Sequence, residues 1–297
     1  MRALVTGAGG FVGPYLTSHL KSCGDEVVGT DTDVDITDAA AVRSSFADAR
    51  PDVVYHLAAA SHVGTSWSAP AEVVRINVDG SLNVLLAALD TGVERVLLVG
   101  SAEEYGRLTP ADLPVAETAP LRPVTPYGAS KAAAEMLAVQ AALGRGLGVV
   151  CARSFNHLGP GQSDALVASS IAKQIVDAER AGGGAVRTGD LSPRRDFTDV
   201  RDVVRAYRLL AERGEPGEAY NVCSGVDVAI QDIADRLAAL ASVTVRFELD
   251  EERLRPVDVP IVRGDNTKLR DATDWSPAIS LDATLGEILD WWRQRVS

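Results

Sequence analysis

Short apolar runs alternate with segments of helical periodicity through the first half of this chain, and this alternation constrains its fold most strongly. The expected strands are residues 3–5, 27–30, 53–57, 96–99 and 149–152. The expected helices lie between them, at residues 11–21, 39–47, 73–89 and 129–143. Strands that are apolar throughout are buried on both faces, and the intervening helices supply the crossovers of parallel strands. The pattern predicts an α/β protein with a doubly wound parallel sheet.

The loop after the first expected strand is rich in glycine. Gly7, Gly10 and Gly13 form the pattern G-x-x-G-x-x-G between a strand and a helix. Glycines permit the tight turn and let backbone N–H groups, including those of Phe11 and Val12, approach a pyrophosphate. A strand, a glycine loop and a helix in this order predict a Rossmann-type dinucleotide site for a nicotinamide cofactor.

Acidic residues follow the second expected strand. Asp31 lies 18 residues after Gly13, where a carboxylate accepts hydrogen bonds from the ribose 2′-OH and repels a 2′-phosphate. This position favours NAD(H), and NADP(H) stays possible if arginines from nearby loops offset the charge. Asp35 and Ile36 are expected beside the adenine. The small residues after the third strand are expected to let the cofactor lie close to the backbone, and they are Leu57, Ala58 and Ala59.

The second half of the chain has a looser pattern. Turns are expected at residues 159–161 and 182–184, helices at 200–212, 230–241 and 281–295, and one strand at 219–222. We expect residues 1–157 to form the NAD(P)-binding domain, with residues 196–224 returning to it. Residues 158–297 are expected to form most of a smaller α/β domain that binds substrate.

Three residues form a candidate catalytic group. Tyr127 and Lys131 are four residues apart in an expected helix, which places them on one face. A free tyrosine has a pKa of about 10, and a neighbouring lysine ammonium together with the positive nicotinamide of an oxidised cofactor is expected to lower it. Ser101 follows an expected strand at the sheet edge where ligands bind, and its hydroxyl can hydrogen-bond a carbonyl or alcohol.

With these motifs in this order, the chain resembles the extended short-chain dehydrogenase/reductase family over essentially its whole length. The resemblance implies that Tyr127 is the acid/base, that Lys131 holds the nicotinamide ribose and tunes Tyr127, and that Ser101 positions the substrate oxygen. It also implies a homodimer formed through the helices at residues 73–89 and 129–143.

Three further segments resemble GDP-4-keto-6-deoxy-D-mannose reductases within that family. They are residues 153–162, 195–202 and 255–265, and Ser154 departs from the pattern because proline is usual there. The resemblance implies NAD(P)H-dependent reduction of the C4 ketone of GDP-4-keto-6-deoxy-D-mannose. The product would be GDP-D-rhamnose or its C4 epimer, with the proton supplied by Tyr127.

A diphosphate requires cations that form paired hydrogen bonds, and arginine is suited to this. Arg195 and Arg255 are the candidates, Asp258 is expected at a ribose hydroxyl, and Asn156 at the pyrophosphate or sugar. His157 is expected on the cofactor side. Two residues are expected to line the substrate pocket, and they are Ser61 and His62.

Glu103 keeps a second hypothesis open. In related dehydratases a glutamate two positions after the catalytic Ser or Thr removes the sugar C5 proton, and Glu103 has that position. A nucleotide-sugar 4,6-dehydratase of the GDP-mannose type, or a 4-epimerase, therefore remains an alternative. A nucleotide-binding regulator without catalysis is a third hypothesis, and the presence of Ser101, Tyr127 and Lys131 argues against it.

Charge and composition limit the partners and location. Lys and Arg number 29 against 41 Asp and Glu, giving a net charge of -12 that disfavours nucleic acid and anionic membranes. No apolar run of membrane-spanning length occurs, and the N-terminal residues do not resemble a signal peptide, so a cytoplasmic location is expected. The three cysteines lack the spacing of a metal site, and no bound metal is expected.

Overall fold

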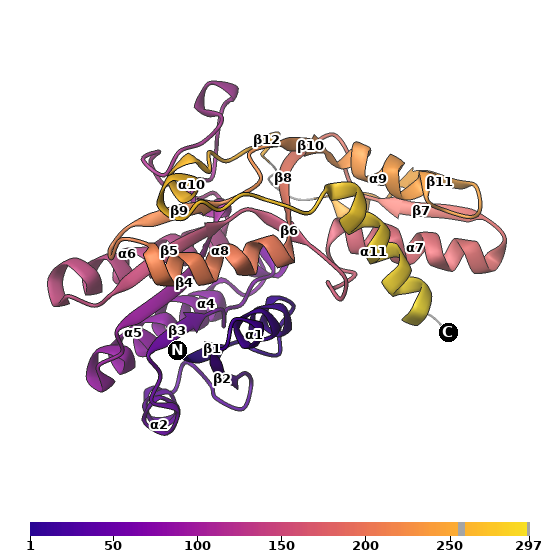
Figure 1. Ribbon diagram of the computed structural model, residues 1–297. Helices are drawn as coiled ribbons and strands as arrows, with labels where there is room; N and C mark the ends of the chain where they lie inside the picture. The colour runs from indigo at the N-terminus through magenta and orange to yellow at the C-terminus, as the bar shows by residue number, and fades with distance from the viewer. Residues whose placement is uncertain (255–258, 296–297) are drawn as a thin grey trace.

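The computed structural model describes residues 1–254 and 259–295, and its largest sheet has six parallel strands (Figure 1). Their order across the sheet is β2 (Glu26–Thr30), β1 (Arg2–Thr6), β3 (Val53–His56), β4 (Arg95–Ser101), β5 (Val149–Ser154) and β9 (Ala219–Val222). The chain moves from β1 to β2 on one side and then returns to β3 on the other side of β1. This reversal opens a crevice at the carboxyl ends of the strands. The predicted α/β class and doubly wound parallel sheet are confirmed.

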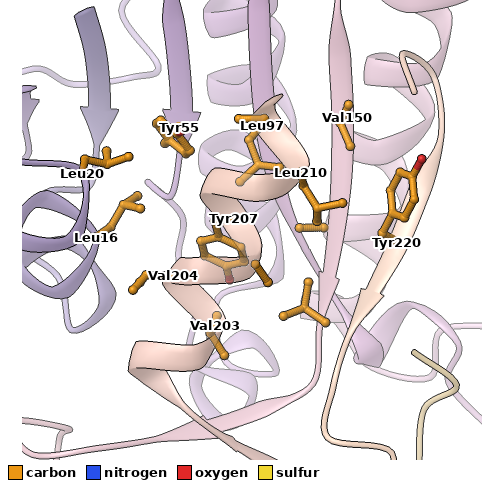
Figure 2. Close-up of a cluster of buried hydrophobic side chains, with 14 of the residues drawn as sticks. Leu16, Leu20, Tyr55, Leu97, Val150, Val203, Val204, Tyr207, Leu210 and Tyr220 are labelled. Atoms are coloured by element: carbon orange, nitrogen blue, oxygen red, sulfur yellow. The ribbon is translucent and has the colours of Figure 1, made fainter. Parts of the chain in front are cut away.

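Two helices cover one face of this sheet, α1 (Val12–Ser22) and α8 (Val200–Arg213). Figure 2 shows Leu16 and Leu20 of α1, and Tyr207 of α8, packed toward sheet residues such as Tyr55 and Leu97. Each fully buried side chain of this size contributes about 1.5–3 kcal/mol through removal of apolar surface from water. Short helix α10 (Thr267–Thr273) adds Leu269 to the same core.

Helices α2 (Ala39–Ala49), α5 (Gly80–Thr91) and α6 (Pro126–Arg145) cover the opposite face. The helix expected at residues 73–89 begins earlier, as α4 (Pro70–Val74), and contains a π-helical turn, η1 (Arg75–Asp79), before α5. Asn77 in this turn is buried, accepts a hydrogen bond from Ala60 N–H at 2.7 Å and donates one to Ser130 Oγ at 2.9 Å. The widened turn thereby joins the end of β3 to helix α6.

The later elements form a second core, seen at the right of Figure 1. Its helices are α7 (Val167–Ala181), α9 (Ile230–Ala239) and α11 (Leu281–Arg295), and its parallel strand pair is β7 (Gly184–Thr188) with β11 (Val245–Leu249). A smaller sheet joins this region to the first, and its strands are β6 (Asn156–Leu158), β8 (Arg194–Asp199), β10 (Asp227–Ala229) and β12 (Ile261–Val262). Short helices complete the fold, at α3 (Val63–Ser66), η2 (Ala102–Glu104), η3 (Pro110–Asp112) and η4 (Glu251–Arg253).

The helices that the structure describes include none long and apolar enough to cross a membrane.

Candidate active site

A cleft of about 790 Å³ lies at the carboxyl ends of the main sheet and extends to β6, α7 and β8. It is lined by most of the residues that the sequence analysis selected, namely Gly7, Gly10, Phe11, Val12, Gly13, Asp31, Asp35, Ile36, Leu57, Ala58, Ala59, Ser61, Ser101, Glu103, Tyr127, Lys131, Asn156, His157 and Arg195. His62 is exposed just before α3, and the cleft walls in the described ranges do not include it. Arg255 and Asp258 lie outside the described residues.

The glycine loop closes one end of the cleft. Gly7 has φ +71°, and a Cβ there would lie 2.8 Å from the backbone nitrogen of Ala58. A Cβ on Gly13 would lie 2.2 Å from the carbonyl oxygen of Ala8, so these glycines permit close packing of backbone. A Cβ on Gly10 would meet only the Gly7 carbonyl oxygen, at 3.3 Å, so the surface of Gly10 is open to the cleft.

The N-terminus of α1 points at this loop. Within the described part of the chain no side chain caps its first turn, so its backbone N–H groups are available to an anion. The open loop and these N–H groups fit the diphosphate of a dinucleotide, because backbone N–H donors there can approach the phosphate oxygens with little steric obstruction.

The acidic residues after β2 differ in their surroundings. Asp31 is exposed, and its Oδ2 lies 2.2 Å from where a Cβ on Gly9 would be, so its carboxylate leans over the glycine loop. Asp35 Oδ1 instead accepts hydrogen bonds from Thr37 N–H and Thr37 Oγ1, both at 2.8 Å. These two hydrogen bonds lower the pKa of Asp35. Asp35 therefore stabilises the turn from residue 35 to residue 37, whereas the carboxylate of Asp31 lies at the glycine-loop end of the cleft.

Helix α6 positions two residues of the candidate catalytic group, Tyr127 and Lys131, because its start is fixed. Thr125 Oγ1 accepts a hydrogen bond from Gly128 N–H at 2.9 Å, and Pro126 provides a preset φ for the first turn. Tyr127 and Lys131 then face the cleft one turn apart, and Lys131 Nζ donates a hydrogen bond to the carbonyl oxygen of Val99 at 2.7 Å.

The pKa values of this pair are set mainly by burial. Burial lowers the pKa of Lys131 to about 8, and the carboxyl of Glu104 opposes that change. Burial raises the pKa of Tyr127, while a hydrogen bond with Ser101 acts in the opposite direction. The sequence analysis expected Lys131 to lower the pKa of Tyr127. In the protein chain by itself burial has the largest effect and the pKa of Tyr127 is raised, whereas the lowering expected with an oxidised nicotinamide bound stays a prediction.

Glu103 and Glu104 follow Ser101 in η2 and point in different directions. Glu103 lines the cleft, and its Oε2 lies 3.5 Å from the hydroxyl of Thr125, which donates to it. Glu104 is completely buried below the cleft, and its Oε1 accepts the Ser101 N–H. One carboxylate therefore forms part of the cleft wall, and the other belongs to the interior.

The far wall of the cleft contains the residues expected to meet substrate. Asn156 is exposed on β6, and Arg195 on β8 is buried to 8% exposure, with Nη1 donating to the Arg194 carbonyl oxygen at 2.8 Å. His157 stacks on Phe11 of the glycine loop, with ring centroids 6.0 Å apart, and its burial lowers the pKa of the imidazole. This contact places His157 at the same end of the cleft as the glycine loop.

The sequence analysis missed Tyr207, which also lines the cleft. Its hydroxyl lies 2.6 Å from Ser154 Oγ, so the serine found where proline is usual forms a polar pair with α8. The only sequence signal for Tyr207 is the amphipathic pattern of its helix, which indicates burial and no site. The apolar part of the far wall was also missed, and it includes Leu166, Val167, Ala168, Phe197 and Val262.

Comparisons with known proteins agree with this geometry. The chain is 36% identical to GDP-6-deoxy-D-mannose reductase of Pseudomonas aeruginosa, over 99% of this chain and 98% of that protein. It is 29% identical to UDP-glucose 4-epimerase of Mycolicibacterium smegmatis, over 99% of each chain.

Among solved structures, RMD from Pseudomonas aeruginosa in complex with NADPH aligns with a TM-score of 0.91 and 35% identity, with both chains covered completely. UDP-glucose 4-epimerase from Thermus thermophilus in complex with NAD aligns with a TM-score of 0.88 and 27% identity, also over the whole of both chains. Residues 3–223 match the model of the NAD dependent epimerase/dehydratase family. This protein therefore belongs to the NAD dependent epimerase/dehydratase family.

Proposed function

We propose that this protein is an NAD(P)H-dependent 4-ketoreductase of a nucleotide sugar, with GDP-4-keto-6-deoxy-D-mannose as its substrate. The observation that carries the proposal is a single cleft that holds the glycine loop at one end and Ser101, Tyr127 and Lys131 on its wall. The 36% identity to a GDP-6-deoxy-D-mannose reductase supports the choice of substrate. The product is GDP-D-rhamnose or its C4 epimer, according to which face of the ketone receives the hydride.

In this mechanism the reduced nicotinamide, when bound, supplies a hydride for C4 of the sugar. Ser101 donates a hydrogen bond to the C4 oxygen, and Tyr127 transfers its phenolic proton to that oxygen as negative charge develops there. Lys131 stays beside Tyr127 through its hydrogen bond to Val99, and its ammonium stabilises the phenolate that forms. Hydride and proton together convert the ketone to an alcohol.

The diphosphate of the cofactor is proposed to lie on the glycine loop and the N-terminus of α1. Asp31 at this end favours NADH, because its carboxylate can accept from a ribose 2′-hydroxyl and repels a 2′-phosphate. NADPH remains a possible cofactor, since the Pseudomonas aeruginosa relative was solved with it. On the far wall, Arg195 is proposed to bind the sugar diphosphate. From the sequence alone, Arg255 is proposed for the same diphosphate and Asp258 for a ribose hydroxyl, and both lie outside the described residues.

We also propose the two-domain organisation expected from sequence, with residues 1–157 and 196–224 binding cofactor and the remainder mostly binding substrate. Its support is that α8 and β9 pack on the main sheet although they follow the second-core elements α7 and β7.

A homodimer is proposed through α4, α5 and α6. Exposed apolar side chains on these helices support it, and they are Val74, Leu82, Met136 and Leu143. Exposed apolar side chains favour a protein interface where they form one contiguous patch. Sedimentation equilibrium tests this state, and Met136→Glu should convert a dimer to monomers. A monomeric wild-type protein contradicts the proposal.

The function is tested by mixing the purified protein with GDP-4-keto-6-deoxy-D-mannose and NADH or NADPH. Absorbance at 340 nm should fall by one equivalent of cofactor for each sugar reduced, and NMR of the product gives its C4 configuration. No cofactor consumption with this ketosugar contradicts the proposal.

The second candidate function rests on Glu103, which lines the cleft two residues after Ser101. A dehydratase or epimerase would use this carboxylate as a base and would regenerate its cofactor in each turnover. Conversion of GDP-mannose or a UDP-hexose without net cofactor consumption would favour it. A non-catalytic regulator is excluded if Tyr127→Phe abolishes the biological effect of the protein.

A further inference from the structure

A buried carboxylate lies directly beneath the proposed catalytic serine. Glu104 is 0% exposed, and its Oε1 accepts the backbone N–H of Ser101 at 2.6 Å, which is a short and therefore strong contact. The Ser101 hydroxyl in turn accepts Glu103 N–H at 3.2 Å, so serine and glutamate cap the η2 turn reciprocally. The peptide that carries the Ser101 hydroxyl is thus fixed by a side chain that does not itself reach the cleft.

The residue before Ser101 leaves space for this contact. A Cβ on Gly100 would lie only 2.6 Å from Glu104 Oε1. A methyl group at this position would therefore displace the carboxylate from the Ser101 N–H. The position of the Ser101 hydroxyl therefore depends on both Gly100 and Glu104.

The other side of Glu104 faces an arginine that links two further elements. Arg153 on β5 donates to both carboxylate oxygens of Glu135, at 2.9 and 2.5 Å, and its Nε lies 3.8 Å from Glu104 Oε2. Glu135 is on α6, one turn after Lys131 and two turns after Tyr127. One guanidinium therefore connects the end of β4, strand β5 and the helix that carries the catalytic pair.

Stability alone gives little reason for this carboxylate. Its burial and the charge of Glu135 raise the pKa of Glu104, which favours the neutral carboxyl group over the ionised form. Removal of Glu104 would leave Arg153 and Glu135 as a matched pair with two hydrogen bonds. A leucine at position 104 would avoid the cost of burying a carboxyl group, and it would leave the Ser101 N–H without this acceptor.

We propose that Glu104 is a positioning residue for ketone reduction, which holds the Ser101 peptide at a fixed place relative to the helix bearing Tyr127. It acts through its hydrogen bond to Ser101 N–H and does not touch substrate. The inference rests on the proposed ketoreductase function. A displacement of a catalytic group by about 1 Å lowers the rate by up to about 100-fold, so the loss of this hydrogen bond should reduce kcat.

The test compares two substitutions in the full-length protein, with NADH and the ketosugar. Glu104→Leu removes the acceptor, and kcat should fall about 30-fold while KM and the Kd for NADH change less than about threefold. Glu104→Gln keeps an oxygen acceptor for Ser101 N–H, and its kcat should stay within about threefold of wild type. Circular dichroism and Tm establish that each variant is folded.

Gly100→Ala provides a second variant that keeps Glu104 but displaces it, and it should reproduce the kcat loss of Glu104→Leu. The matched control is Glu179→Leu, since Glu179 also accepts a backbone N–H, from Ser242 at 2.8 Å, and pairs with Arg293 outside the cleft. This control should lower Tm and leave kcat unchanged.

A folded Glu104→Leu or Gly100→Ala variant with kcat within twofold of wild type overturns the inference. Equal damage in Glu104→Gln and Glu104→Leu overturns it as well, because the retained acceptor should rescue the rate. If wild type itself fails to reduce the ketosugar, the proposed function fails instead, so the two failures are distinguishable.

Discussion

The two ends of the cleft are built in different ways. At the glycine-loop end, the wall includes residues close together in sequence, such as Gly7 and Gly10 between β1 and α1 and Gly13 in the first turn of α1. At the far end, the wall combines segments separated by many residues, with Asn156 on β6, Leu166 before α7 and Arg195 on β8.

This difference separates what the family shares from what each member selects. A dinucleotide requires the same backbone donors and tight packing in every member, which local sequence can encode. A nucleotide sugar is selected by side chains from several loops, which vary without changing the sheet. Substitutions at the two ends should therefore separate cofactor binding from substrate binding.

The largest effect is expected at the boundary between the ends. Tyr127→Phe removes the proposed proton donor and should lower kcat about 1,000-fold, while cofactor affinity and Tm stay near wild type. Stopped-flow measurement of NADH oxidation gives the rate, with Tyr220→Phe as a buried control away from the cleft. A Tyr127→Phe variant that keeps more than about a tenth of the activity would show that another group supplies the proton.

Gly13→Ala should damage the cofactor end alone. Its Cβ would lie 2.2 Å from the Ala8 carbonyl oxygen, so the loop must shift, and we expect the Kd for NADH to rise about 100-fold. Fluorescence titration measures this Kd. Gly286→Ala in α11 is the control, because no atom of the described residues outside its own helix turn lies within 4 Å of a Cβ there. Unchanged NADH affinity in a folded Gly13→Ala variant would show that the glycine loop does not bind the cofactor.

Arg195→Lys should show the opposite selectivity. Loss of paired hydrogen bonds to a diphosphate costs about 2 kcal/mol, which corresponds to a rise of about 30-fold in KM for the nucleotide sugar. The Kd for NADH should not change. The adjacent Arg194→Lys is the control, because Arg194 pairs with Asp227 outside the cleft. A joint loss of both affinities would contradict the separation of the two ends.

The pH dependence tests the state of Lys131. Burial lowers its pKa to about 8, so the ammonium is present below that pH and is lost as pH rises through it. We expect kcat/KM to fall about tenfold for each unit above pH 8. Lys131→Arg should move this decrease in kcat/KM to higher pH, because a guanidinium stays charged. If kcat/KM of Lys131→Arg decreases at the same pH as in wild type, another group is responsible for the titration.

The smallest effect concerns the adenosine portion of the cofactor end. Asp31→Ser removes the charge that opposes a 2′-phosphate, and it should shift the kcat/KM ratio of NADPH to NADH about tenfold toward NADPH. Asp38→Ser removes an acid from the same loop and retains an N-cap for α2, so it is the control. A shift of equal size in both variants would attribute the preference to overall charge.

Several features were predictable because they depend on residues close in sequence. The glycine loop requires only a strand, a turn and a helix in succession, and the pairing of Tyr127 with Lys131 requires only helical spacing. The strands of the main sheet were predictable for a similar reason, since burial on both faces leaves continuous apolar runs.

Features that depend on distant contacts were not predictable. The sequence analysis treated residues 73–89 as one regular helix, whereas the π-helical turn forms where Asn77 meets Ala60 and Ser130. The pair of Tyr207 and Ser154 joins residues 53 positions apart. No local pattern encodes either contact, because each depends on how helices are placed on the sheet.

The sequence by itself determined the parallel sheet, the glycine loop and the identity of Ser101, Tyr127 and Lys131 as a group. Only the tertiary structure decided that desolvation raises the pKa of Tyr127, that Glu103 lines the cleft while Glu104 is buried, and that His62 is absent from the described cleft wall. The physical reason is that exposure, desolvation and side-chain direction arise from packing between distant segments, whereas strand and helix patterns arise from neighbours along the chain.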